Sequence, residues 1–119
     1  MGEQEPGGEE RRASGDVPPG GAILVLSGFY EGLEIPIDRD WFVIGRGRGA
    51  DVMLAEPTIS RAHAAIGCDG EGFFVQDLGS TNGTLVNGQR RERTALASGD
   101  EIRIGRLHLR VRFPARGHA

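Results

Sequence analysis

Hydrogen-bond donors suited to an anion occur in three short polar stretches of the sequence. An arginine fork, hydroxyl groups, an amide and backbone N–H groups exposed by glycine are the donors that a dianionic phosphate group needs. Taken singly, each residue also has a plain explanation, because an arginine can be a solvated edge charge and a serine can stabilise a turn. The donors are Arg46, then Ser60 and Arg61, and then Ser80, Thr81 and Asn82.

The last of these stretches, "DLGSTNGT" over residues 77–84, contains more polar residues than a reversal of the chain requires. Asn82 followed by Gly83 suffices for a tight turn, since both residues tolerate positive φ values. We therefore predict that Ser80 and Thr81 are surplus to the turn and face a ligand. The prediction is firmer for Thr81 than for Ser80.

Patterns typical of enzymes and cofactor sites fail on their context. Residues 45–50 fit G-x-G-x-x-A, but a dinucleotide loop must open a helix, and Pro57 follows without any helical periodicity. Ser60 and His63 could form a nucleophile and base, yet no nucleophile elbow surrounds them. The three histidines and the one cysteine lack metal-ligand spacing. We predict no enzyme, no cofactor and no metal site.

The elements that must position the donors are strands, because apolar and polar residues alternate with a period of two from residue 21 onward. Residues 107–113 show the alternation most clearly, and residues 102–104 repeat it. The stretch 89–98 has only Leu96 as a large apolar residue, so no amphipathic helix is expected there. An all-β sandwich or barrel is predicted. Further strands are expected at residues 22–26, 33–37, 41–46, 52–54, 63–68, 73–77 and 84–86.

Composition indicates one domain in a reducing compartment. The chain has 119 residues, of which 38% are hydrophobic, and its single cysteine, Cys68, cannot form an internal disulfide. No apolar run approaches the roughly 20 residues of a membrane span, and no secretion signal begins the chain. A cytoplasmic protein with no membrane association is expected.

Residues 1–20 are rich in glycine, proline and acidic residues and cannot bury enough apolar surface to become ordered. They are predicted to be a flexible acidic tail, followed by one domain over residues 21–114 and a short C-terminal tail over residues 115–119. Because the tail carries the chain's net charge of −3, residues 21–119 have no net charge. A nucleic-acid partner would require a basic excess, so none is expected.

Four motifs in order, "IGRGRGADVML", "PTISRAHAAI", "FFVQDLGSTNGTLVNGQRR" and "LASGDEIRIG", closely resemble the forkhead-associated (FHA) domain. The resemblance covers about residues 22–113. It implies an all-β sandwich of about eleven mostly antiparallel strands without a substantial helix. It also implies that the loops at one end of the sandwich bind phosphothreonine peptides.

The same resemblance implies phosphopeptide-binding roles for five residues. Arg46 would donate charge-assisted hydrogen bonds to the phosphate group, and the hydroxyl of Ser60 would bond a phosphate oxygen. Arg61 would contact the phosphate or the peptide backbone. Thr81 would lie close to the phosphate, while the amide of Asn82 would fix the peptide main chain.

Five further residues are expected to support the site rather than to touch the ligand. Gly45 would allow a close approach of two chain segments, and His63 would hold the loop that carries Ser60. Gly83 and Asn87 would set turns. Ser80 is grouped with them as a supporting residue.

The resemblance implies a signalling module that acts downstream of a serine/threonine kinase and looks bacterial. Its partner would be a phosphothreonine-containing protein, such as a kinase or a kinase substrate. Selectivity is sought at Thr58 and in residues 48–50, and Ser14 after two arginines looks like a kinase site. The alternative is a phosphate-independent interaction or oligomerisation domain, which would not need Arg46, Ser60 and Asn82 together.

Overall fold

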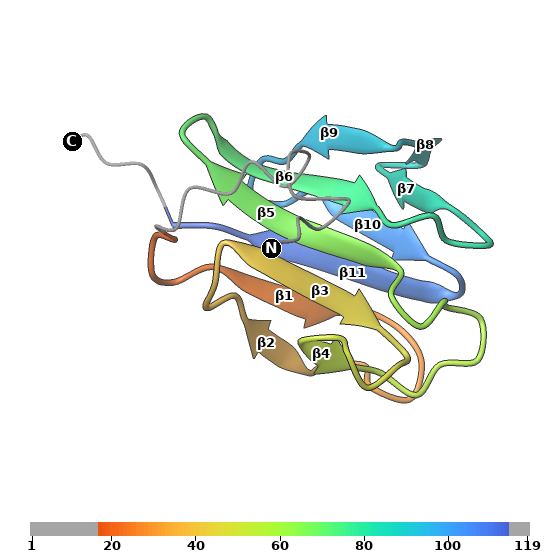
Figure 1. The fold of residues 1–119 in the computed structure, drawn as a ribbon. Coiled ribbons are helices and arrows are strands. Elements are labelled where there is room, and N and C mark those ends of the chain that lie inside the picture. The colour runs from red at the N-terminus through yellow and green to blue at the C-terminus, as the bar shows by residue number, and fades with distance from the viewer. Residues whose placement is uncertain (1–16, 115–119) are drawn as a thin grey trace, which may run out of the picture.

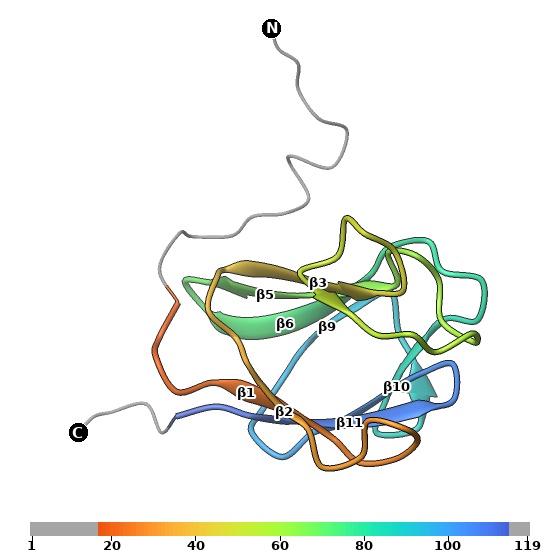
Figure 2. The same cartoon turned by 90° about the horizontal axis from the view of Figure 1, so that it is seen from below.

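The computed structural model describes residues 17–114, and these residues form two β-sheets that pack face to face (Figures 1 and 2). No helix occurs within this range, so none is available to cross a membrane. The predicted C-terminal tail, Ser14 and most of the predicted N-terminal tail lie outside the described residues. The all-β class predicted from the alternation is confirmed.

The two sheets contain six and five strands. The six-stranded sheet has the order β2-β1-β11-β10-β7-β8, and the five-stranded sheet has the order β4-β3-β5-β6-β9. All strand pairs are antiparallel except β3 with β4. The strands are β1 (Ala22–Val25), β2 (Glu34–Pro36), β3 (Trp41–Gly45), β4 (Val52–Met53), β5 (Ala64–Asp69), β6 (Gly72–Asp77), β7 (Thr84–Val86), β8 (Gln89–Arg90), β9 (Arg93–Ala95), β10 (Glu101–Ile104) and β11 (Leu107–Arg112).

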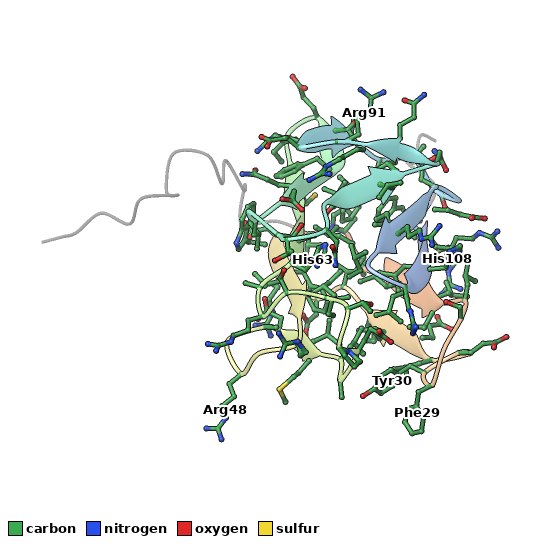
Figure 3. The ribbon with its side chains drawn as sticks, turned by 90° about the vertical axis from the view of Figure 1, so that its right-hand side faces the viewer. Phe29, Tyr30, Arg48, His63, Arg91 and His108 are labelled. Atoms are coloured by element: carbon green, nitrogen blue, oxygen red, sulfur yellow. The ribbon has the colours of Figure 1, made fainter. Side chains whose placement is uncertain are left out.

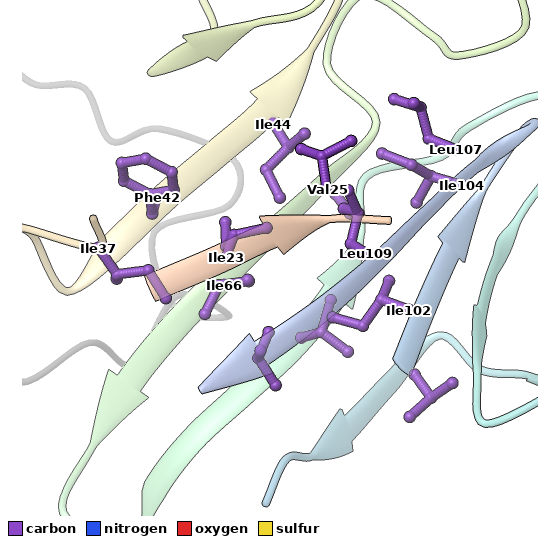
Figure 4. Packing of buried hydrophobic residues seen from close by; sticks show 14 of the residues in the cluster. Ile23, Val25, Ile37, Phe42, Ile44, Ile66, Ile102, Ile104, Leu107 and Leu109 are labelled. Carbon is purple, nitrogen blue, oxygen red and sulfur yellow. The ribbon is translucent and has the colours of Figure 1, made fainter. Parts of the chain in front are cut away.

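The core lies between the sheets because the alternating apolar residues of each strand face inward (Figure 4). In the β10–β11 hairpin, Ile102 pairs with Leu109, and both side chains are almost fully buried. Ile66 of β5 pairs with Phe42 of β3, and its own exposure is 0%. This packed core is the rigid base from which the connecting loops project.

Four of these connections leave the same end of the sandwich, on the right in Figure 1. They are the β3–β4, β4–β5 and β6–β7 loops and the tight β10–β11 hairpin. β3 and β6 end there and β5 and β7 begin there, because neighbouring antiparallel strands reverse direction. The polar stretches singled out in the sequence therefore converge in space.

Most predicted strands agree with the observed ones to within one residue at each end. The exceptions are β8 and β9, which lie in the stretch 89–98 where no strand was predicted. Both are short edge strands with mostly exposed side chains, so they lack the apolar alternation on which the prediction relied.

Truncating the central core residue should destabilise the whole domain. We expect Ile66→Ala to lower the free energy of unfolding by about 2–5 kcal/mol, because a fully buried side chain leaves a cavity when it is shortened. Urea denaturation followed by tryptophan fluorescence would measure the change. Phe29→Ala is the matched control, since that ring is 92% exposed and its removal should cost far less. Equal losses for the two variants would contradict the assigned core.

Candidate functional site

A fully buried histidine connects two of the converging loops. His63, whose exposure is 0%, accepts a hydrogen bond at Nδ1 from the backbone N–H of Ser60 at 3.1 Å. Its Nε2 lies 2.8 Å from the carbonyl oxygen of Gly83. Because Nδ1 accepts, Nε2 must carry the proton and donate, which defines the neutral tautomer. His63 lies between the two loops in the end-on view of Figure 3, and it holds the β4–β5 loop as predicted.

Ser60 and His63 are not arranged as a nucleophile and a base in this structure. The imidazole contacts the backbone N–H of Ser60 and not its hydroxyl group, and both ring nitrogens are already engaged. A general base needs a free nitrogen within hydrogen-bond reach of the nucleophile. Within residues 17–114, no three histidine, cysteine or carboxylate side chains come together as a metal site.

Arg46 is held at the end of β3 by residues 59–61 of the β4–β5 loop. Its backbone N–H donates to the carbonyl of Ser60 at 3.0 Å, and its Nε donates to the carbonyl of Ile59 at 2.9 Å. The preceding residue must be glycine, because a Cβ on Gly45 would lie 1.9 Å from the carbonyl oxygen of Arg61. This is the close approach predicted for Gly45.

The fixed Nε leaves the two terminal nitrogens of the Arg46 guanidinium directed outward. Arg46 is exposed, and neither Nη1 nor Nη2 bonds another residue within the described range. One edge of the guanidinium is therefore anchored and the other is available. Two parallel N–H donors in fixed positions suit a planar or tetrahedral oxyanion.

Ser60 and Thr81 meet across the β4–β5 and β6–β7 loops. The backbone N–H of Thr81 donates to the Ser60 hydroxyl oxygen at 3.1 Å. The hydroxyl of Ser60 acts only as an acceptor here, so its own proton remains free to donate. The side chain of Thr81 is exposed and bonds no other described residue, and its contact with a ligand remains a prediction.

Asn82 makes a second connection between the β6–β7 loop and the β4–β5 loop. Its Nδ2 donates to the carbonyl of Thr58 at 2.9 Å, so one of its two amide protons is used within the protein. The second amide proton and Oδ1 stay available at the exposed surface. The predicted contact of Asn82 with a ligand main chain is compatible with this arrangement and remains a prediction.

Ser80 belongs to the turn, so the prediction that it is surplus to the turn was wrong. Its hydroxyl donates to Asp77 Oδ1 at 2.6 Å and accepts from the backbone N–H of Gly83 at 2.8 Å. The carboxylate of Asp77 also accepts from the backbone N–H groups of Gly79 and Ser80 and from the hydroxyl of Thr84. The error arose because a turn of this length needs internal acceptors that the pair Asn82-Gly83 does not supply.

These contacts shift the ionisation of Asp77. Burial alone would raise the pKa of this carboxyl, but the hydrogen bonds from the hydroxyls of Ser80 and Thr84 and from the two backbone N–H groups outweigh it. The pKa of Asp77 is therefore lowered. The sequence signal was the aspartate that opens the motif, since aspartate commonly bonds the backbone two residues later.

The other predicted residues take the following places. Arg61 is exposed, its carbonyl accepts from the backbone N–H of Gly47 at 3.0 Å, and its guanidinium bonds no described residue. Asn87 has a positive φ of 51° and bonds the backbone N–H of Glu101 and the carboxylate of Asp100. It therefore sets the β7–β8 turn and fixes it to β10, away from the donors.

Thr58, where selectivity was sought, has its polar atoms engaged inside the protein. Its hydroxyl donates to Glu56 at 2.7 Å and accepts from the backbone N–H of Arg106 at 2.8 Å. Hydrogen bonds from the hydroxyl and backbone of Thr58 lower the pKa of Glu56. Thr58 thus fixes the β10–β11 hairpin beside the site. Residues 48–50 remain the exposed place to look for selectivity, and Arg48 projects outward in Figure 3.

Sequence reasoning missed an arginine and an aromatic pair. Arg90 of β8 lies against Gly83, where an added Cβ would be 2.6 Å from its Nε. The hydroxyl oxygen of Tyr30 accepts from the backbone N–H of Ala55 at 2.9 Å, which joins the β1–β2 loop to the β4–β5 loop. Phe29 meets Tyr30 edge to face, with ring centroids 5.1 Å apart. No local pattern marks Arg90, whose contact depends on the hairpin between β7 and β8.

The chain matches a known family and several characterised relatives. The family model described as "FHA domain" matches residues 42–105. The oxoglutarate dehydrogenase inhibitor of Corynebacterium diphtheriae is 39% identical over 111 residues, covering 90% of this chain and 78% of that protein. The glycogen accumulation regulator GarA of Mycobacterium tuberculosis is 38% identical over 105 residues, covering 86% of this chain but only 65% of GarA.

Solved structures resemble the fold over about four fifths of the chain. A structure from a study of phosphothreonine-dependent FHA domain interactions superposes with a TM-score of 0.73 at 33% identity, covering 81% of this chain and 98% of that one. The FHA domain of FhaA, complexed with the intracellular domain of Rv3910, has a TM-score of 0.71 at 34% identity and covers 78% of this chain and 100% of its own.

The Asp77 contacts predict a pH-dependent contribution to stability. A carboxyl with a lowered pKa stabilises the fold above its unfolded pKa and loses that effect as the pH falls through the folded pKa. We expect Asp77→Asn to cost about 1 kcal/mol near pH 7 and progressively less below about pH 4.

Thermal unfolding of both proteins between pH 7 and pH 3 would measure this difference. Glu92→Gln, at an exposed carboxylate with no hydrogen bond to a described residue, is the control and should leave the stability unchanged. A penalty for Asp77→Asn that stays constant over this range would show that the charge of Asp77 contributes nothing.

Proposed function

Because the chain belongs to the forkhead-associated domain family, we propose that it is a non-catalytic module that binds phosphothreonine in a partner protein. The observation that carries the proposal is the convergence of Arg46, Ser60 and Thr81 at one end of the sandwich. Each is hydrogen-bonded to a residue of another loop, and each has a donor that no described residue uses. A phosphate group is the ligand that would satisfy all of these donors together.

The assigned roles follow from which donors remain available. The terminal nitrogens of Arg46 would form charge-assisted hydrogen bonds to two phosphate oxygens, and the hydroxyl of Ser60 would donate to a third. Arg61 directly follows Ser60 and would add a further positive charge beside the phosphate group. The second amide proton and Oδ1 of Asn82 would bond the peptide main chain beside the phosphothreonine.

The expected affinity is moderate. Hydrogen bonds to charged groups contribute about 1.5–3 kcal/mol each, so three or four would supply most of the roughly −8 kcal/mol of a micromolar complex after the costs of association. Because the loops already bond one another, little ordering is required of the protein. Reversible binding of this strength suits a signal that a phosphatase can terminate.

A regulatory role is the natural use of such a site. Two relatives are named as an inhibitor of oxoglutarate dehydrogenase and as a regulator of glycogen accumulation, which are roles that act through other proteins. By analogy, this chain would act downstream of a serine/threonine kinase, with the kinase or one of its substrates as the phosphorylated partner. A cytoplasmic location is compatible with that role and remains a prediction.

The exposed ring of Phe29 supports a second, phosphate-independent contact with a partner protein. Phe29 is 92% exposed on the β1–β2 loop, which Tyr30 joins to the loop that carries Ser60. An exposed aromatic residue on an ordered loop is typical of protein interfaces. It could add contact area for a folded partner, but it gives no reason for the free donors of Arg46 and Ser60.

Loss of Arg46 should abolish phosphopeptide binding. We expect Arg46→Ala to weaken binding to a degenerate phosphothreonine peptide library by about 100-fold or more, since two charge-assisted hydrogen bonds are removed. Fluorescence anisotropy would measure binding, with matched phosphoserine and unphosphorylated libraries beside it. The native protein should bind only the phosphothreonine library.

The control is Arg112→Ala, which removes a guanidinium that is paired with Glu34 far from the converging loops. It should bind like the native protein. No binding to any library, or equal binding by native protein and Arg46→Ala, would favour the phosphate-independent alternative.

Binding should weaken in mild acid because the ligand loses charge. The second pKa of a phosphate monoester is about 6, so the dianion is converted to the monoanion below that pH. We expect a several-fold loss of affinity between about pH 7.5 and about pH 5.5. Repeating the anisotropy titrations at both values would measure it, and an unchanged affinity would count against recognition of the dianion.

A further inference from the structure

The arginines of the described residues fall into two groups. One group forms ion pairs with carboxylates, as in the pair of Arg110 with Glu101 at 2.6 Å. The other group forms no ion pair with any described residue. The paired arginines are Arg39, Arg93, Arg110 and Arg112. The unpaired arginines are Arg46, Arg48, Arg61, Arg90, Arg91, Arg103 and Arg106.

The unpaired group surrounds the proposed phosphate site. Four of its members lie in the converging loops, Arg90 and Arg103 lie on β8 and β10, and Arg91 directly follows β8. The carboxylates of these loops are already occupied, because Glu56 accepts hydrogen bonds from Thr58, and Asp77 accepts them from its own turn. The basic charge at this end is thus left for a ligand, although residues 21–119 as a whole have no net charge.

Arg90 is the unpaired arginine whose position is best defined. A Cβ on Gly83 would lie 2.6 Å from its Nε, 2.7 Å from its Cζ and 3.0 Å from its Nη2. The guanidinium therefore covers the backbone of the residue that directly follows Asn82. It makes no hydrogen bond to a described residue, so its N–H groups are available beside the proposed contact with the ligand main chain.

Arg103 lies on the same outward face of the six-stranded sheet. Leu85 of β7 pairs with Arg90 on one side and with Arg103 on the other. The two arginines are therefore two strands apart, and Leu85, the residue between them on β7, carries no charge that could balance theirs. The sheet provides a carboxylate for Arg110 but not for these two arginines. An anionic side chain of a ligand would supply the missing charge.

We propose that Arg90 and Arg103 form an acidic-residue subsite, which binds an Asp or Glu side chain of the same phosphopeptide. This inference rests on the proposed function and specifies its ligand as a phosphothreonine segment flanked by carboxylates. An extended peptide advances about 3.3 Å per residue, so the acidic side chain would lie within a few residues of the phosphothreonine. Asp and Glu residues beside the phosphothreonine would then distinguish the partners of this domain from other proteins that contain phosphothreonine.

Three peptides on the native protein and its variants would test the subsite. One has a phosphothreonine with Asp and Glu on both sides, the second has the phosphothreonine with Ser and Ala on both sides, and the third is the acidic peptide without phosphate. The test variant is Arg90→Gln/Arg103→Gln. The matched control is Arg39→Gln/Arg112→Gln, which removes the same charge from ion-paired positions away from Gly83.

We expect the native protein to prefer the acidic phosphopeptide by about five-fold at low salt, since each exposed charge pair contributes modestly. The test variant should bind both phosphopeptides equally and keep its affinity for the neutral one within about two-fold. The control variant should retain the preference. Raising the salt concentration should reduce the preference in the native protein, because exposed charges are screened.

Opposite results overturn the inference. Equal binding of both phosphopeptides by the native protein, or a preference that survives in the test variant, would show that these arginines bind no acidic side chain. An equal loss for both phosphopeptides would assign the arginines to the phosphate itself. Failure of the native protein to bind either phosphopeptide would instead refute the proposed function. Arg90→Gln alone, at an exposed edge position, should lose part of the preference for the acidic phosphopeptide. This single variant keeps the test informative if the double variant does not fold.

Discussion

The arrangement of the ligand-binding end depends on the buried imidazole of His63. This single side chain bonds the backbone of Ser60 with one nitrogen and that of Gly83 with the other. Its own backbone pairs with Ile44 and Leu78, so it also joins β3 to the β6–β7 loop. A neutral imidazole has one donor and one acceptor on opposite sides of the ring, so it can satisfy a carbonyl and an N–H group at once. Loss of this ring would leave two buried polar groups unpaired and separate the loops that carry the donors.

The hydrogen bonds of the site divide its polar atoms into two classes. One class is saturated inside the protein, as with Asp77 and Thr58, and within residues 17–114 no buried side-chain nitrogen or oxygen lacks a partner. The other class keeps a free donor at the surface, as with Arg46, Ser60 and Asn82. Saturated atoms define the shape of the loops, and free donors can then bind without further ordering of the chain. Such preorganisation is what allows a few surface contacts to give a useful affinity.

The sequence allowed local features such as strands to be predicted, but it gave no indication of contacts between distant segments. The period-two alternation predicts nine of the strands because burial of one face is a local requirement, whereas β8 and β9 lie at sheet edges that bury little. The motif residues are predicted to converge, and they do. The bond of Asn82 to Thr58 spans 24 positions in the chain, and the contact of Arg90 with Gly83 depends on a hairpin. Neither contact produces a periodic or compositional pattern in the sequence.

Glycine positions explain how the same loops can be close-packed and still carry large cationic side chains. Gly45 is required because the carbonyl of Arg61 occupies the space of a Cβ, and this contact brings Arg46 and Ser60 together. Gly83 has a positive φ of 83°, yet its missing side chain matters as much, since the Arg90 guanidinium fills that space. Gly45 thus lets two backbone segments meet, and Gly83 lets a guanidinium lie against the backbone. Charge that would otherwise extend into solvent is concentrated where an anionic ligand must pass.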